Sequence, residues 1–130
     1  MNRNLATALA MLAVTSVVCL APAHAQTIPP ACQQLVTAWR ACGTAYVHLA
    51  ELKEPAQAVQ AKQQLESSLT NITSQMRAAV RQAGAQVVAE RCATPEAKGQ
   101  MVQSIAAVIT MLGFGGGMTE ECNEAYSAIR

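Results

Sequence analysis

The chain has 130 residues, a formal net charge of +1, 52% hydrophobic residues and only 3% aromatic residues. No Asp occurs, and the basic residues are scattered along the chain instead of forming a block. This distribution argues against nucleic-acid binding and against electrostatic docking on anionic lipid, which both need a clustered cationic surface. A chain rich in Ala, Gln and Leu is helix-prone, and its length predicts one domain.

The first 25 residues have the pattern of a secretory signal. Arg3 supplies a positive charge, residues 5–20 form an uncharged run rich in Ala, Val and Leu, and residues 23–25 (Ala-His-Ala) match a small-x-small cleavage site. The run is too short and too interrupted for a stop-transfer helix. Cleavage would leave residues 26–130 as a single domain with zero net charge. The sequence therefore predicts a bacterial protein exported through a signal peptide, periplasmic or secreted.

Two long helices are expected next. Pro30 lies where proline is tolerated in a first helix, and an apolar stripe at helical spacing continues to about Lys53. Pro55 starts the second helix, which shows the strongest periodicity in the chain. Helix-favouring residues continue to Arg91, with Gly84 as the weak point.

A third and a fourth helix follow. Thr94 is a suitable N-cap for a helix that runs to about Leu112 and ends in the glycine-rich residues 113–117. Thr119 caps the last helix, which continues to the C-terminus. Because no strand pattern appears, we expect an all-α fold, a small disulfide-stapled bundle of about four helices.

Removing the signal leaves four cysteines, which in an oxidising compartment predict two disulfides. Cys32 and Cys42 are ten residues apart on one predicted helix, a rise of roughly 15 Å, whereas a disulfide needs Cα atoms within about 7 Å. Each must therefore pair with Cys92 or Cys122. A straight second helix would carry Cys92 too far, so we predict a break around Gly84 and the pairs Cys32–Cys92 and Cys42–Cys122. The alternative pairing is Cys32–Cys122 with Cys42–Cys92.

No catalytic, cofactor-binding or metal-binding residue is predicted. The cysteines lack the close pairs of a zinc site and the C-x-x-C motif of a redox site. His48, the only histidine after residue 25, is interpreted as a partly exposed helix residue. Together with a methionine it suggests a haem or copper carrier, but the candidate methionines are scattered, which favours core packing. Those methionines are Met76, Met101, Met111 and Met118.

Residues 99–119 contain no charged side chain. They approach the length of a membrane span, but polar residues interrupt them. One interpretation is the central helix of the bundle, buried all round. The functional interpretation is a surface that becomes exposed and contacts a partner, with Phe114 as an apolar tip and residues 113–117 as a hinge. The candidate interaction surface consists of Ile105, Ile109, Leu112, Phe114 and Met118.

The segment from Cys32 to Cys42 resembles the twin Cys-x9-Cys helical hairpins of the mitochondrial intermembrane space. It departs from that pattern because Cys92 and Cys122 are 30 residues apart. The spacing is more similar to small exported bacterial helical proteins of unknown function, which begin with Cys-x9-Cys and carry two later cysteines. That resemblance implies an exported location and no known activity.

The predicted function is a non-catalytic exported protein that acts by protein–protein interaction, such as an inhibitor, a toxin-immunity protein or an accessory protein. It is not expected to be an enzyme, to bind nucleic acid or to carry a cofactor. One alternative is a periplasmic chaperone or membrane-active protein that uses residues 99–119, and another is a haem or metal carrier. The partner is an unidentified protein, membrane contact is a lesser possibility, and the oligomeric state stays open.

Overall fold

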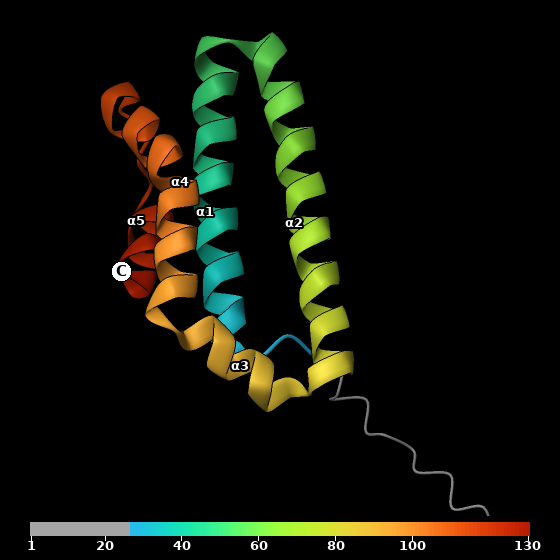
Figure 1. Ribbon diagram of the computed structural model, residues 1–130. Coiled ribbons are helices and arrows are strands. Elements are labelled where there is room, and N and C mark those ends of the chain that lie inside the picture. Colours follow the sequence, from blue (N-terminus) through green and yellow to red (C-terminus); the bar gives the residue numbers. More distant parts are fainter. Residues whose placement is uncertain (1–26) are drawn as a thin grey trace, which may run out of the picture.

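The computed structural model describes residues 27–130, which form five α-helices and no strand within that range (Figure 1). The all-α fold class is confirmed. The signal peptide and cleavage site predicted for residues 1–25 lie outside the described residues. The helices are α1 (Pro30–Lys53), α2 (Pro55–Ala83), α3 (Ala85–Ala93), α4 (Pro95–Gly115) and α5 (Glu120–Ile129).

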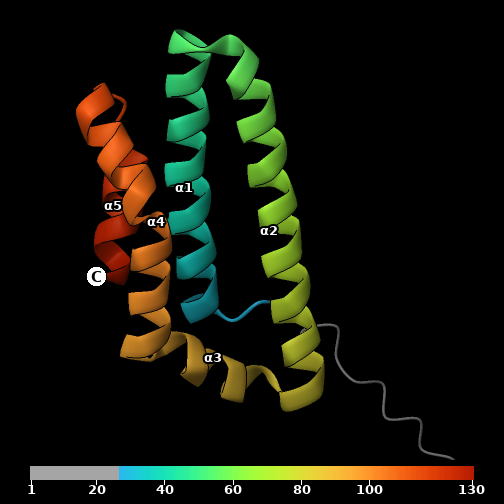
Figure 2. The same ribbon diagram turned by 45° about the horizontal axis from the view of Figure 1, so that its top comes forward.

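The centre of the bundle is α1, which packs against each of the other four helices. Figures 1 and 2 both show α1 between α2 and α4, with α3 crossing one end. Its buried side chains include the small Ala38 and Ala45 on one face and Val36 and Val47 on another. Small side chains allow neighbouring helices to approach closely, so α1 is covered from several directions.

The break predicted around Gly84 is confirmed, and it explains why five helices form instead of four. Gly84 separates α2 from α3 and has φ +89°, a conformation that is open to glycine and strained for other residues. Its backbone N–H still donates to the Val80 carbonyl, which closes the last turn of α2. The chain can therefore turn without leaving that carbonyl unpaired, and α3 carries Cys92 back toward α1.

The two disulfides join the pairs that helix geometry favoured. The Cα atoms of Cys32 and Cys92 are 5.1 Å apart, and those of Cys42 and Cys122 are 4.5 Å apart. The alternative pairing is therefore wrong. All four half-cystines are buried in the core, where they tie α1 to α3 at one level and to α5 at another. These disulfides are consistent with an oxidising compartment.

Both predicted threonine caps are present. Thr94 Oγ1 accepts a hydrogen bond from the Ala97 N–H at 3.2 Å, and Thr119 Oγ1 accepts one from the Cys122 N–H at 3.2 Å. The helix predicted to end at about Leu112 is α4, and it continues three residues further, to Gly115. The left-handed residue that terminates it comes later, at Gly116, with φ +69°.

Candidate functional site

The structure separates the five residues predicted as an interaction surface. Ile105 and Leu112 are 1% and 0% exposed and belong to the core cluster, while Ile109 is half-buried against that cluster. Phe114 is 91% exposed, and Met118 is also exposed. Ile105 and Leu112 thus hold α4 on the bundle, and in this structure they are not part of any surface. The predicted surface is reduced to Phe114, Met118 and the edge of Ile109.

The interpretation of α4 as a central helix buried all round is wrong. Only Ile105 and Leu112 are buried along its length, while Ala106, Ala107 and Met111 are exposed. The central position belongs to α1, and α4 covers one side of it. No helix within residues 27–130 is both long and apolar enough to span a membrane.

Exposed apolar side chains occur near the ends of α1 and α4, and both helix ends lie toward the top of Figure 1. Leu52, in the last turn of α1, is 73% exposed, and Phe114 lies in the last turn of α4. The Lys53 ammonium group donates to the Gly115 carbonyl at 3.3 Å and links the ends of the two helices. We call this surface the apolar end, and it consists of Leu52, Met111, Phe114 and Met118.

Glycines hold α4 close to α1 at the apolar end. A Cβ at Gly115 would stand 2.5 Å from Leu49 Cδ2, and a Cβ at Gly117 would stand 3.0 Å from Leu49 Cβ. Leu49 thus packs directly against the backbone of α4 and of the following turn. Phe114 precedes Gly115 and is rotated by about 100° on the helix. Because Gly115 faces Leu49 on α1, the neighbouring Phe114 faces solvent.

Carboxylates border the apolar end. Glu51 and Glu54 lie where α1 ends, and Glu120 and Glu121 lie in the first turn of α5, just after Met118. The dipole of α5 favours its two glutamates at that position. The disulfide of Cys122 with Cys42 places this turn lower along α1, so a partner of the apolar end would meet Glu51 and Glu54 beside the apolar side chains.

His48 is exposed, as the sequence predicted. Its Nδ1 atom lies 3.4 Å from Glu51 Oε2, a long contact between two exposed side chains. No group of three or more His, Cys, Asp or Glu side chains within residues 27–130 is arranged to hold a metal ion. The methionines considered for a haem or copper site are dispersed, since Met76 and Met101 pack on the core while Met111 and Met118 are exposed.

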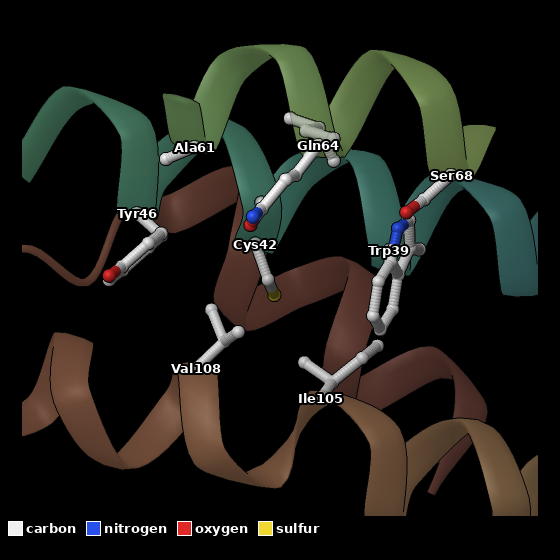
Figure 3. Close-up of a pocket in the computed structure, with 10 residues that line it drawn as sticks. Trp39, Cys42, Tyr46, Ala61, Gln64, Ser68, Ile105 and Val108 are labelled. Atoms are coloured by element: carbon white, nitrogen blue, oxygen red, sulfur yellow. The ribbon is translucent and has the colours of Figure 1, made fainter. Parts of the chain in front are cut away.

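A cavity of about 230 Å³ opens between α1, α2 and α4 (Figure 3). The floor comes from α1 through Trp39, Cys42, Gly43 and Tyr46, and the walls come from α2 and α4. No pattern in the sequence predicted this cavity. Trp39 and Tyr46 belong to the apolar stripe of the first predicted helix, so that pattern indicated core packing for both. The residues on the walls are Ala61, Gln64, Leu65, Ser68, Ile105 and Val108.

Trp39 brings an unsatisfied donor to this cavity. Its Nε1 atom is buried and has no hydrogen-bond partner. A buried donor without an acceptor costs about 1–3 kcal/mol. In Figure 3 the indole nitrogen lies toward α2, on the side of Ser68, while the far edge of the ring lies toward Ile105. The cavity thus combines a mostly apolar lining with the side chains of Gln64, which is exposed, and Ser68, which is half-buried, and the unpaired indole N–H lies beside it.

No family model, curated protein or solved structure matches the chain.

Proposed function

We propose that the protein is a non-catalytic exported protein that binds another protein through its apolar end. The observation that carries this proposal is Phe114, which is 91% exposed at the tip of α4. The signal pattern of residues 1–25 and the two disulfides support export to an oxidising compartment, periplasmic or secreted.

Phe114 has the properties of a binding anchor. An aromatic side chain can bury about 150–250 Å² in an interface, and a few such side chains dominate the binding energy of most interfaces. The platform under Phe114 is held in place by the packing of Leu49 on Gly115 and by the hydrogen bond of Lys53. Because this platform is formed before binding, little conformational entropy has to be lost when a partner docks.

The border of the apolar end indicates the chemistry of the partner. Glu51 and Glu54 lie beside the apolar end, where α1 ends, and Lys53 is already engaged with the Gly115 carbonyl. Complementary charge favours a protein with an apolar recess rimmed by Lys or Arg. The same carboxylates would be repelled by anionic lipid headgroups, which disfavours a membrane as the binding surface.

Two variants test the proposal. Phe114→Ser removes the anchor, while Val87→Ser removes an exposed apolar side chain on α3, at the opposite end of the bundle. The oxidised wild-type protein and both variants are used to isolate partners from an oxidised extract. Each isolated partner is then purified, and its affinity is measured by calorimetry. We expect one partner whose affinity falls at least about 30-fold in Phe114→Ser and less than about twofold in Val87→Ser.

The contribution of the carboxylates to partner binding can be tested separately. Glu51→Lys with Glu54→Lys should weaken the same complex and reduce its dependence on salt concentration, because these carboxylates lie beside the apolar end and would meet a basic rim. Equal affinity of the wild-type protein and Phe114→Ser for every partner would overturn the proposal. Binding of the wild-type protein to anionic vesicles, lost in Phe114→Ser, would replace the protein partner by a membrane.

A further inference from the structure

We propose that the cavity between α1, α2 and α4 binds a small uncharged amphiphile, a mostly apolar molecule with one neutral polar group. This proposal does not depend on the apolar end. The cavity volume of about 230 Å³ exceeds the roughly 150 Å³ of an apolar cavity that holds benzene and is below the roughly 300–1,000 Å³ of sites for drug-sized ligands. The ligand is therefore small, such as a short-chain alcohol, ester or amide.

The lining of the cavity disfavours charged ligands. None of its ten residues is Asp, Glu, Lys, Arg or His. A carboxylate or ammonium group that entered would lose hydration without gaining an opposite charge. The chain of a fatty acid would fit, but its charged head would not be stabilised. An uncharged molecule is favoured for this reason.

The polar and apolar groups of the cavity lie on different sides. Figure 3 shows Gln64 and Ser68 on the α2 side and Ile105 and Val108 on the α4 side. Gln64 is exposed and Ser68 is half-buried, and the buried indole N–H on the side of Ser68 has no hydrogen-bond partner. A bound amphiphile would lie with its apolar body against α4 and its polar group toward α2.

The cavity is formed in advance, as small-molecule sites usually are. Cys42 on its floor is covalently tied to Cys122 in α5. Gly43 lets α1 and α2 approach closely, since a Cβ there would clash with the Leu65 side chain. A rigid floor and a fixed spacing of two walls favour a ligand of defined size over an adaptable peptide.

The experiment uses the single tryptophan of the chain. In a nitrogen–proton correlation spectrum of the oxidised protein, Trp39 supplies one indole N–H resonance. The protein is titrated with octanol, octanoate and octylammonium, which share the same chain and differ in charge. We expect a saturable shift of the indole resonance with octanol, and an affinity at least about tenfold lower for the two charged probes.

Variants of residues that line the cavity show whether octanol binds there. Ala61→Phe fills the cavity and should abolish the shift, whereas Ala56→Phe places the same side chain on an exposed position of α2 and should leave it unchanged. Gln64→Ala with Ser68→Ala leaves the buried core intact and should lower the affinity for octanol about tenfold. This double variant keeps the proposal testable if Ala61→Phe does not fold.

Four results would overturn the proposal, and the first three concern the octanol titration. They are the absence of a saturable octanol shift, equal affinity for all three probes, and a shift that survives both Ala61→Phe and the double alanine variant. A fourth is an indole resonance that moves with protein concentration while sedimentation shows a dimer. In that case a second copy of the chain, and not an amphiphile, covers the cavity.

Discussion

Gly115 packs against Leu49 so closely that a Cβ on Gly115 would stand 2.5 Å from Leu49 Cδ2. This contact joins the end of α4 to the end of α1 and positions the exposed Phe114. It is also the contact in the apolar end that a single methyl group would disturb most directly.

Gly115→Ala should therefore lower the free energy of unfolding by about 1–3 kcal/mol, because Leu49 and the α4 backbone must separate to admit the methyl group. The measurement is urea unfolding of the oxidised protein. Gly113→Ala is the matched control, since a Cβ there meets nothing within 4 Å and the residue is helical. That control should be stabilised by about 0.5–1 kcal/mol, since alanine favours the helix over glycine. Equal effects of the two substitutions would contradict the close fit.

Gly84→Ala should destabilise the protein by about 1–3 kcal/mol, because φ of +89° at the α2–α3 break is strained for any residue with a Cβ. Space is not the cause, as a Cβ at Gly84 meets nothing within 4 Å. Gly99→Ala, inside α4 and also open, should increase stability. Thermal unfolding of the two variants separates the effects. A neutral Gly84→Ala would show that the break does not require a positive φ.

Leu112 and Phe114 are neighbours in α4 with opposite exposure, so their substitutions should differ sharply. Leu112→Ala should destabilise by about 2–5 kcal/mol, since a fully buried side chain is lost and a cavity remains. The free energy of unfolding of Phe114→Ser should stay within about 0.5 kcal/mol of the wild-type value, as expected for an exposed position. Chemical denaturation measures both. A large loss in Phe114→Ser would mean that Phe114 packs on the protein and is not free to bind a partner.

The two disulfides should stabilise the protein by similar amounts. Their sequence separations are 60 and 80 residues, and the chain-entropy model makes the difference only about 0.3 kcal/mol, out of several kcal/mol for each. Replacing Cys32 and Cys92 by Ser, or Cys42 and Cys122 by Ser, tests this in parallel. If the second pair proves far more important, the packing of α5 on α1 must depend on its disulfide for reasons beyond chain entropy.

Thr94→Ala and Thr119→Ala should each lower stability by about 1 kcal/mol, because each removes an oxygen that accepts a backbone N–H of the first helical turn. Thr110→Ala is the control. Its hydroxyl donates to the Ala106 carbonyl at 2.8 Å within α4, so its loss leaves no buried group unpaired. Circular dichroism during thermal unfolding gives the three values. Equal effects at all three positions would argue against capping as the cause.

The pairing of the cysteines could be predicted because it depends on distance along a helix. Cys32 and Cys42 are too far apart on α1 to bond, and the left-handed Gly84 allows Cys92 to return to the level of Cys32. The caps at Thr94 and Thr119 were predictable for a similar reason, since a cap involves only the residues next to it.

The place of α4 could not be predicted in the same way. Its uncharged composition favoured the centre of the bundle, yet α1 lies there. Small side chains such as Ala38 and Ala45 let several helices pack on α1, whereas α4 leaves Ala106, Ala107 and Met111 exposed. Hydrophobic composition measures how much a helix gains from burial, but the volumes of facing side chains decide which helix is surrounded.

By itself, the sequence determined the helical class and the starts of four of the five helices, and it favoured the break at Gly84 and the disulfide pairs, because these follow from local propensity and from the fixed rise of a helix. The tertiary structure alone decided that Ile105 and Leu112 face inward while Phe114 faces outward. It also brought Trp39 beneath the wall formed by Gln64 and Ser68. Such relations depend on how three helices pack together in space, and no pattern within one helix contains them.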